Sequence, residues 1–341
     1  MGTAVGDALG LPYEGLSPRR AEKLLGAPDR FRFLFGRGMV SDDTEHACMT
    51  TQALMAAGDD VQRFVHDLAW RLRFWLLGLP AGVGLATLKA TVRLWLGFPP
   101  QRSGVFSAGN GPAMRSVVLG TAIDDVELLR RLVTASTRLT HSDPKADYGA
   151  FAVALAARMA SSGQQPDAAR FAAELHSYLP DTTSAELLAL VDRMVVSVTS
   201  GESTENFVLS MGWRKGVSGY IYQTVPAVLH AWLSHPLDFR AALTSVIRCG
   251  GDADTTGAIL GGIVGSAVGK GGIPSAWLDR LAEWPRSVAW MERLGEELVS
   301  ARTKGESCRP PRLALVPLLL RNLLFLAVVL GHGFRRLLPP Y

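Results

Sequence analysis

The sequence predicts an all-α protein, a single compact orthogonal multi-helix domain of about a dozen helices that ends in a hydrophobic helical tail. Apolar residues recur at three-to-four spacing, Ala, Leu and Arg are frequent, and alternating strand patterns are scarce. The chain has 341 residues, of which 48% are hydrophobic and 19% charged, which is enough to bury a large core. No long linker interrupts it, so residues 1–300 are predicted to form one domain and 301–341 a separate tail.

The individual helices follow from this periodicity and from the signals that separate them. In chain order they are predicted over Ala4–Leu11, Ala47–Ala57, Val61–Leu77, Asp124–Leu139, Gly149–Ser161, Asp167–Tyr178, Thr183–Thr199, Gln223–Leu233, Phe239–Arg248 and Thr255–Val268. Separators such as Ser142-Asp143-Pro144 and Pro180-Asp181-Thr182 carry turn and N-cap residues.

Two of the predicted helices carry glycine at every fourth position. The sets are Gly2, Gly6 and Gly10, and Gly257, Gly261, Gly265 and Gly269. Glycine costs a helix up to about 1 kcal/mol relative to alanine, so such runs indicate a face that another backbone approaches closely. The apolar stretch 258–268 is far shorter than the roughly 20 residues that span a membrane. Both helices are therefore predicted to be buried and central.

Charge and cysteine content exclude several classes of protein. The net charge is only +4, and no basic stripe with interleaved aromatic residues is present, so general nucleic-acid binding is not expected. The three cysteines are unclustered, which favours a reducing compartment over a cysteine metal site. The N-terminus lacks the pattern of a signal peptide. We therefore expect a cytoplasmic protein.

Two acidic clusters with hydroxyl side chains lie far apart in the sequence. They are Ser41-Asp42-Asp43-Thr44 and Gly250-Gly251-Asp252-Ala253-Asp254-Thr255. Oxygen ligands of this kind suit Mg²⁺ or Ca²⁺, and carboxylates crowded beside apolar sequence need a cation to offset their repulsion and desolvation. If the fold brings the clusters together, they form a binuclear site. The alternative is that Asp42 and Asp252 only cap the helices that follow them.

Three further motifs accompany the acidic clusters. Residues 6–14 read GDALGLPYE, residues 109–115 read GNGPAMR, and Thr140 precedes His141. Free backbone N–H groups in a Gly-Asn-Gly loop that opens a helix suit a pyrophosphate, although such a loop is most often only a turn. The five motifs occur in the order seen in the ADP-ribosylglycohydrolase family, which the chain resembles over residues 2–270.

This resemblance implies a Mg²⁺-dependent hydrolase that cleaves the bond between the distal ribose of ADP-ribose and an acceptor, either a protein side chain or a small molecule. Two ions per chain are implied, with Mn²⁺ as a substitute. One ion is implied to bind Ser41, Asp42, Asp43 and Asp254, and the other Asp252, Asp254 and Thr255. The family usually has threonine where this chain has Ser41, whose hydroxyl is retained. The sequence does not identify the acceptor or the oligomeric state.

The resemblance also implies roles for individual residues. Glu14 and Asp43 are the catalytic carboxylates, and Glu14 moves a proton while an oxocarbenium-like state forms. A solvated surface glutamate is the alternative reading of Glu14. Asp7 is expected to support the site through hydrogen bonds or helix capping. Substrate binding is implied for Ser107, Gly109, Asn110, Gly111, Met114 and His141.

Two departures from the family pattern leave a second hypothesis open. Homologues of the human type carry an aromatic residue directly before the Gly-Asn-Gly loop, where this chain has Ala108. Phe106, Tyr220 or Tyr222 is then the candidate for stacking on the adenine. Together with Ser41, this departure supports a catalytically silent homologue that binds ADP-ribose or metal in a structural or sensing role.

The tail is not explained by the resemblance. Residues 313–331 read LALVPLLLRNLLFLAVVLG, with arginines on both sides. Apolar residues favour insertion by roughly 0.3–0.6 kcal/mol each, and Arg321 near the centre opposes it by roughly 2.5–3.5 kcal/mol, so spanning a membrane is marginal. Basic flanks favour peripheral contact of 313–331 with a membrane surface or a partner. A hairpin packed back onto the body and a true span are the alternatives.

Overall fold

The computed structural model describes residues 1–337 and confirms the all-α class. Within these residues there are 17 α-helices, and the only strand-like pairings are isolated bridges between loops. The helices of the first half are α1 Gly2–Gly10, α2 Pro18–Leu25, α3 Asp42–Ala57, α4 Val61–Leu77, α5 Leu85–Trp95, α6 Gly111–Ala122, α7 Val126–Arg138 and α8 Pro144–Ser161. Those of the second half are α9 Ala168–Tyr178, α10 Asp181–Thr199, α11 Thr204–Ser210, α12 Ile221–Ser234, α13 Phe239–Arg248, α14 Ala253–Val268, α15 Ser275–Leu278, α16 Val288–Lys304 and α17 Leu315–Arg335. Short 3₁₀ turns are η1 Leu11–Tyr13, η2 Leu34–Gly36, η3 Pro100–Arg102 and η4 Lys270–Gly272.

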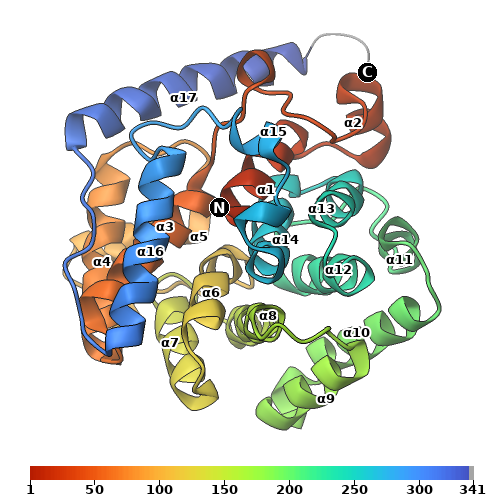
Figure 1. Ribbon diagram of the computed structural model, residues 1–341, viewed down its shortest axis with the longest axis horizontal. Coiled ribbons are helices and arrows are strands. Elements are labelled where there is room, and N and C mark those ends of the chain that lie inside the picture. The colour runs from red at the N-terminus through yellow and green to blue at the C-terminus, as the bar shows by residue number, and fades with distance from the viewer. Residues whose placement is uncertain (338–341) are drawn as a thin grey trace.

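The two glycine-bearing helices pack against each other at the centre of the molecule (Figure 1). A Cβ atom on Gly6 would lie 2.0 Å from the carbonyl oxygen of Gly257, and one on Gly2 would lie 2.0 Å from that of Gly261. Real side chains cannot occupy such space, so glycine is required for this approach. Gly269 is the exception within its set, because it ends α14 with a φ of +63° and has no neighbour at its Cβ position. The predicted central position of both helices is confirmed.

Several helices begin earlier than the apolar pattern predicts, because polar caps precede the apolar face. Helix α3 begins at Asp42 instead of Ala47, since the Ser41 hydroxyl accepts a hydrogen bond from the Asp43 N–H group. Helix α8 begins at Pro144 instead of Gly149, since the Asp143 carboxylate caps it and proline suits its first turn. Both extensions lie in the first turn, where hydrophobic periodicity carries no signal.

Five helices were not predicted, namely α2, α5, α11, α15 and α16. Helices α11 and α15 contain only seven and four residues, too few to establish a period. Helix α2 buries a single residue, Ala21, so its apolar face is almost absent. Helix α5 follows a Pro-Gly-rich run that reads as a loop, and α16 alternates charged residues with a narrow buried stripe that includes Trp290 and Leu294.

Helix α17 packs along the body and forms the upper edge of the view in Figure 1. Phe325 is buried in a small apolar cluster with Leu11, Phe33 and Met39. Arg321, whose charge opposes insertion of this segment into a membrane, is only 4% exposed. Among the alternatives for the tail, packing onto the body is therefore observed, as one helix instead of a hairpin. By length and composition α17 could also cross a membrane, but this is weak support for a span.

Candidate catalytic site

The fold brings the two acidic clusters together at the N-termini of α3 and α14. Ser41 is the N-cap of α3 and Asp252 is the N-cap of α14. The hydroxyl of Thr255 donates to Oδ2 of Asp43 at 3.2 Å, and the hydroxyl of Ser41 donates to the same oxygen at 3.2 Å. The side chain that caps α3 is Ser41 and not Asp42, and Asp252 makes no side-chain capping hydrogen bond, so the alternative in which these two aspartates only cap helices is not observed.

Asp7 supports the first cluster from α1. Its carboxylate accepts hydrogen bonds from the N–H group of Ser41 at 2.9 Å, the N–H group of Thr44 at 3.2 Å and the hydroxyl of Thr44 at 2.5 Å. Burial raises the pKa of Asp7 to about 7, while these hydrogen bonds oppose the shift. The expected supporting role of Asp7 is confirmed, and α1 thereby fixes the start of α3.

Glu14 reaches the same place through the turn that follows η1. The N–H group of Gly15 donates to the carbonyl of Gly251 at 2.7 Å, and the N–H group of Gly251 donates to the carbonyl of Leu16 at 2.8 Å. Gly251 has a φ of +85°, and a Cβ there would lie 2.0 Å from the carbonyl oxygen of Val217. Desolvation, followed by the nearby charge of Asp252, raises the pKa of Glu14. Glu14 therefore lines the same cavity as Asp252 and Asp254, while its side chain remains exposed to solvent.

The carboxylates of the two clusters have too few partners within the chain. Burial raises the pKa values of Asp42, Asp43 and Asp254 well above the usual range, and repulsion from neighbouring carboxylates, Asp7 among them, adds to the shift. One oxygen of Asp43 and one of Asp254 are buried without a hydrogen-bond partner. A divalent cation bound by oxygen ligands would satisfy both atoms. Across residues 1–337, no three Asp, Glu, His or Cys side chains group closely enough to hold a metal alone, so hydroxyls, water or substrate would have to complete its coordination.

The Gly-Asn-Gly loop lines the same cavity as the acidic clusters and contacts the second of them. Asn110 precedes α6 but does not cap it, because its amide donates to Asp252 at 2.5 Å and to the Thr224 hydroxyl at 2.9 Å. A Cβ on Gly109 or on Gly111 would lie 3.0 or 3.1 Å from the ring of His141. Helix α6 has no side-chain cap, and of its first three residues Gly111 has an N–H group without a hydrogen-bond acceptor among residues 1–337, Pro112 has none, and that of Ala113 donates to the carbonyl of Asn110 at 2.8 Å.

His141 is buried behind this loop in an uncharged form. Burial and the guanidinium of Arg115 lower the pKa of His141 to about 3. Arg115 donates to the hydroxyl oxygen of Thr140 at 2.8 Å, and this oxygen lies 2.9 Å from Nδ1 of His141. Because Arg115 only donates, the Thr140 hydroxyl is free to donate to Nδ1, and in that arrangement the ring proton is on Nε2, on the side of Gly109. The ring can thus donate one hydrogen bond toward the site.

These elements enclose a cavity of about 600 Å³. Among the predicted site residues it is lined by Glu14, Asp42, Ser107, Gly109, Asn110, Gly111, Met114, His141, Asp252, Asp254 and Thr255. Ser41 lines a smaller adjoining cavity, and Asp43 is buried beneath, with 1% exposure. A larger cavity of about 800 Å³ lies between α4, α16 and residues 307–318, but no residue of the acidic clusters lines it.

Sequence reasoning missed one wall of the 600 Å³ cavity. Gly82, Gly84 and residues 85–87 line it, so the N-terminus of α5 joins that of α6 at the same cavity. Gly84 precedes α5 and offers no side-chain cap. The run 79–84, LPAGVG, was the available signal, because a glycine-rich loop that opens a helix also suits an anion. Ser218 and Gly219 complete the wall and carried no such signal.

Of the three aromatic candidates for adenine stacking, the structure removes one. Tyr222 is 1% exposed and belongs to the core, so it has no free ring face. Tyr220 is half-buried, and its hydroxyl is engaged by Lys145 and Glu186. Phe106 is 80% exposed and lies directly before Ser107 at the cavity. Phe106 is therefore the candidate with a free ring.

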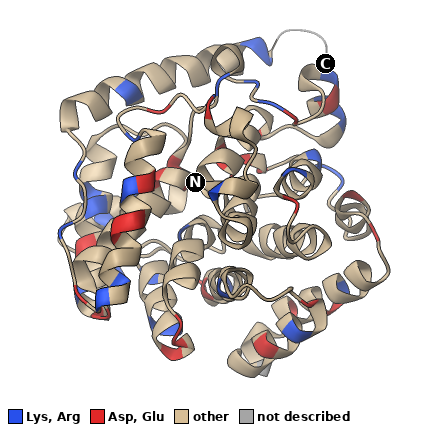
Figure 2. Cartoon of the chain, viewed as in Figure 1, with Lys and Arg blue, Asp and Glu red and all other residues tan. Residues whose placement is uncertain are grey.

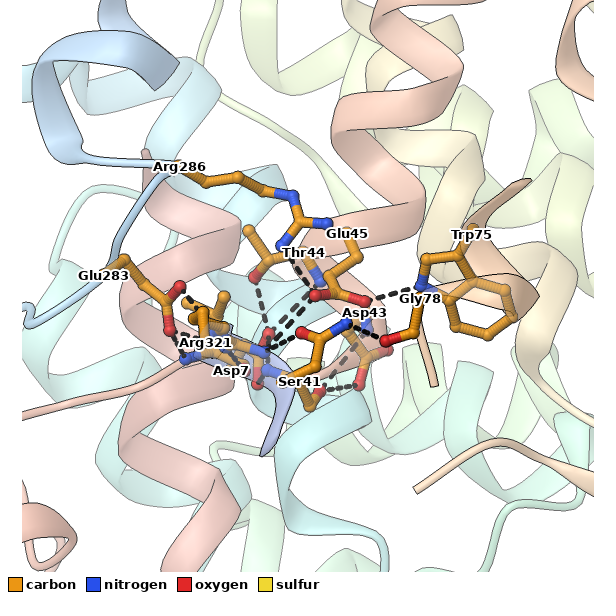
Figure 3. A network of polar contacts seen from close by, with 12 residues as sticks. Asp7, Ser41, Asp43, Thr44, Glu45, Trp75, Gly78, Glu283, Arg286 and Arg321 are labelled. Atoms are coloured by element: carbon orange, nitrogen blue, oxygen red, sulfur yellow. Dashed lines mark hydrogen bonds and ion pairs between the residues drawn. The ribbon is translucent and has the colours of Figure 1, made fainter. Parts of the chain in front are cut away.

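A buried network of charges lies behind the first acidic cluster (Figure 3). Glu45 accepts hydrogen bonds from Arg286 at 2.6 Å and from Arg321 at 3.3 Å. Glu283 accepts from Arg321 at 2.6 Å and from the N–H group of Val40 at 2.8 Å. The charges of two glutamates and two arginines thus balance. Through the Val40 N–H group the network also holds the residue immediately before Ser41.

The C-terminal end of α17 contacts the segment that carries Glu14. The guanidinium of Arg336 donates to the carbonyl of Glu14 at 2.6 Å and to that of Pro12 at 2.7 Å. His332 lies 3.2 Å from the same Pro12 oxygen. A cavity of about 120 Å³ is lined by Glu14, Ser41 and Asp254 together with Phe325, Val329, His332 and Arg336. The tail therefore forms one wall of the site.

Comparison with known proteins gives a consistent assignment. The sequence model of the ADP-ribosylglycohydrolase family matches residues 1–307. An uncharacterised protein of Archaeoglobus fulgidus is 30% identical over 83% of this chain and 90% of its own length. The ADP-ribosyl-[dinitrogen reductase] glycohydrolase of Rhodospirillum rubrum is 27% identical over 82% and 88%, and the ADP-ribosylhydrolase ARH3 of Gallus gallus is 25% identical over 81% and 86%.

A solved structure supports the same assignment at the level of the fold. It is described as an ADP-ribosylglycohydrolase-related protein complex and has a TM-score of 0.63 and 26% identity, over 89% of this chain and 95% of that chain. The match of the family model covers all five motifs of the site, while α17 lies beyond it. The chain therefore belongs to the ADP-ribosylglycohydrolase family and is an enzyme that hydrolyses ADP-ribose linkages.

Proposed function

We propose that the reaction is Mg²⁺-dependent and cleaves the glycosidic bond between the distal ribose of ADP-ribose and an acceptor. One observation carries the proposal. Asp254, which has a buried oxygen without a hydrogen-bond partner among residues 1–337, lines one cavity together with the N-termini of α5 and α6, and neither helix has a side-chain cap. Such a cavity offers cation ligands on one side and anion-binding N–H groups on the other. ADP-ribose has vicinal ribose hydroxyls, which can bind a cation, next to a pyrophosphate, which is an anion, so it matches both kinds of group in this cavity.

The acidic wall is the proposed metal site. Ser41, Asp42, Asp43 and Asp254 are proposed to hold one ion, and Asp252, Asp254 and Thr255 the other, with Mn²⁺ able to replace Mg²⁺. When bound, the ions would supply positive charge that orients the distal ribose and offsets the repulsion between carboxylates. The raised pKa values of Asp43 and Asp254 support this proposal, because buried carboxylates without a counter-charge are otherwise costly.

The opposite wall is proposed to bind the rest of ADP-ribose. The N–H groups of residues 85–87 at the start of α5 and of Gly111 at the start of α6 would receive the pyrophosphate, and Nε2 of His141 would donate one further hydrogen bond from behind the loop. Ser107, Gly109 and Asn110 form the floor between the two helix ends. Phe106 is proposed to stack on the adenine in the place that Ala108 cannot fill.

The proposed proton transfers use Glu14. As the bond between C1″ and the acceptor breaks, positive charge develops on the ribose ring, and the Glu14 carboxylate stabilises it. The oxygen of a water molecule bonds to C1″ as the bond from C1″ to the acceptor breaks, and Glu14 takes one proton from that water and passes it to the departing acceptor. The products are ADP-ribose and the unmodified acceptor. The raised pKa of Glu14 suits a group that both accepts and returns a proton.

The acceptor and the compartment complete the proposal. An ADP-ribosylated protein and a small ADP-ribose compound are both compatible with a cavity of about 600 Å³ that is open at the Glu14 side. The three cysteines, Cys48, Cys249 and Cys308, are free thiols. Free thiols are typical of a reducing compartment, and we propose a cytoplasmic location on that basis.

The test is release of ADP-ribose from a panel of substrates. The full-length chain is incubated with ADP-ribosyl-arginine, ADP-ribosyl-serine and O-acetyl-ADP-ribose, each with Mg²⁺ and each with EDTA. We expect release from at least one substrate with Mg²⁺ and loss of release with EDTA. Release that is equal in EDTA contradicts the metal proposal. Tight binding of ADP-ribose without turnover of any substrate supports the silent homologue instead.

A further inference from the structure

Helix α17 turns its apolar face away from the protein. The exposed side chains on it are Leu315, Val316, Leu319, Leu320, Leu323, Leu324, Leu326, Leu330 and Phe334, with exposed fractions of 36–68%. They recur at three- and four-residue spacing, so they form one continuous stripe along the helix. Large apolar stripes are rare on the surface of a monomeric soluble protein and indicate an interaction site.

The orientation of the stripe is fixed by polar contacts on the inner face. Arg321 pairs with Glu283 and Glu45 in the buried network, and Asn322 donates to the carbonyl of Gly78 at 2.7 Å. The helix is therefore held parallel to the body surface, with its polar side inward. A true span would have to remove Arg321 from two buried carboxylates and place it in lipid, so a helix lying in the plane of a surface is favoured.

Two loops extend the apolar surface beside α17. Phe35 is 102% exposed, and the adjacent Leu34 packs against the cluster that contains Phe325. Leu79 is 60% exposed and follows Gly78, the residue that Asn322 binds. Phe35 and Leu79 also have φ values of +56° and +55°. This left-handed backbone costs a non-glycine residue of order 1–3 kcal/mol and clusters at functional surfaces. The loops thus hold large apolar side chains in solvent at an energetic cost.

The charges around the stripe are of one sign. Arg309 and Arg312 are exposed before the helix and Arg335 is exposed at its end. No aspartate or glutamate occurs after Glu306 in the sequence, and Figure 2 shows blue but no red along α17. In a dimer formed through this stripe, with either helix orientation, arginines would face arginines. An anionic surface therefore matches the charges better than a second copy does.

We propose that the outer face of α17, together with Phe35 and Leu79, binds the surface of an anionic lipid membrane. The helix spans about 31 Å at 1.5 Å per residue and lies in the plane of the membrane, with its apolar side about 5–10 Å deep in the headgroup region. Arg309, Arg312 and Arg335 contact lipid phosphates. The inner face remains anchored to the enzyme, so binding holds the catalytic cavity close to the membrane. The proposal does not depend on the hydrolytic reaction.

The test is flotation of the full-length chain with lipid vesicles. Vesicles of phosphatidylcholine alone are compared with an equimolar mixture of phosphatidylcholine and phosphatidylglycerol. We expect binding to the mixture that weakens as salt is added. The double variant Leu320→Glu with Leu323→Glu is expected to bind at least about tenfold more weakly. Arg309→Gln and Arg312→Gln are each expected to weaken binding about fivefold.

The matched control is Val196→Glu, because Val196 is 70% exposed on α10, away from α17 in Figure 1. It should bind vesicles as the parent does, and all variants should keep the parent's thermal stability. Three outcomes overturn the proposal. The parent fails to float with the anionic vesicles, the parent floats equally with both vesicle types, or the α17 double variant floats as the parent does. A dimer that the double variant dissociates, without any flotation, assigns the face to a second copy instead.

Discussion

Thr255 donates a hydrogen bond to the carboxylate of Asp43 at 3.2 Å, although 212 residues separate them in the sequence. This contact joins the N-termini of α14 and α3. It is possible because α1 packs against both helices, with glycine against α14 and with Asp7 against α3. The two acidic clusters consequently lie in direct contact.

Asp254→Asn is expected to abolish both metal binding and hydrolysis. Asp254 is proposed to be a ligand of both ions, and one of its oxygens is buried without a hydrogen-bond partner among residues 1–337. Isothermal titration with Mg²⁺ and release of ADP-ribose measure the two properties. Asp192→Asn is the matched control, since the Asp192 carboxylate is 57% exposed and binds only His176. Hydrolysis at the parent rate in the Asp254 variant contradicts the proposed metal centre.

Glu14→Gln is expected to lower kcat by about 10²–10⁴-fold while Mg²⁺ binding persists. Glutamine keeps the size of the side chain but cannot accept the proton of the attacking water. The pH profile gives a second readout. Because the pKa of Glu14 is raised, the parent should lose activity on the acidic side at a higher pH than an ordinary glutamate would cause. This limb should disappear from the residual activity of the variant. An unchanged kcat assigns the proton transfer to another group.

Without a divalent cation, the chain is expected to lose stability as the pH rises. The pKa of Asp7 is raised from 3.8 to about 7, and those of Asp42 and Asp254 are raised well above 3.8. A carboxyl with a higher pKa in the folded state binds its proton more tightly when folded. Stability is therefore present at low pH and is lost as the pH rises from 3.8 to about 7.

Mg²⁺ should reverse this loss, because it competes with the same protons. The increase in Tm on adding Mg²⁺ is thus expected to grow across that pH window. Thermal unfolding in Mg²⁺ and in EDTA, at several pH values, measures both effects. An increase in Tm that is independent of pH would show that the cation binds elsewhere.

Gly6→Ala is expected to destabilise the chain by about 1–3 kcal/mol or more, since its Cβ would overlap the carbonyl of Gly257 and force α1 and α14 apart. The same substitution has the opposite sign at Gly295. That residue lies on the exposed side of α16 with no neighbour at its Cβ position, so Gly295→Ala should add up to about 1 kcal/mol. Urea unfolding measures both free energies. Equal effects would contradict the close approach of the central helices.

Arg321→Met is expected to cost about 3–5 kcal/mol, because it leaves Glu283 buried without its counter-charge. Arg335→Met at the exposed end of the same helix is the control and should change stability by less than about 0.5 kcal/mol. Adding Glu283→Gln to the Arg321 variant removes the unpaired charge and should recover part of the loss. No recovery would mean that packing, and not charge, explains the role of Arg321.

The central helices and the composition of the site could be predicted from the sequence. Glycine at every fourth position has few uses other than close packing, so the burial of α1 and α14 followed from Gly6 and Gly257 alone. The acidic clusters were recognisable because carboxylates beside apolar sequence are costly without a purpose. Whether the two clusters meet could not be predicted, because local sequence patterns do not encode a long-range contact such as that between Thr255 and Asp43.

Other parts of the site left no local signal. Asn110 was assigned to substrate through the family resemblance, but its amide is bound to Asp252, a partner 142 residues away. The part of the cavity that α5 lines was not predicted, because a run of Pro and Gly indicates a loop whether or not a helix follows it. The sequence predicts that Arg321 disfavours insertion of the tail into a membrane, because a sum of hydropathy values treats every charge as unpaired. Its partners, Glu45 and Glu283, are distant in the sequence.

Helix α17 lies beyond the region that the family model matches, yet it neutralises a glutamate within that region. A carboxylate and a counter-ion that belong to different parts of a gene must be inherited together. In relatives without such a tail, the position of Glu283 should therefore hold an uncharged residue, or another arginine should reach it from the body. Where the tail is present, Glu283 and Arg321 should change together. The pair thus offers a simple marker for which members of the family share this arrangement.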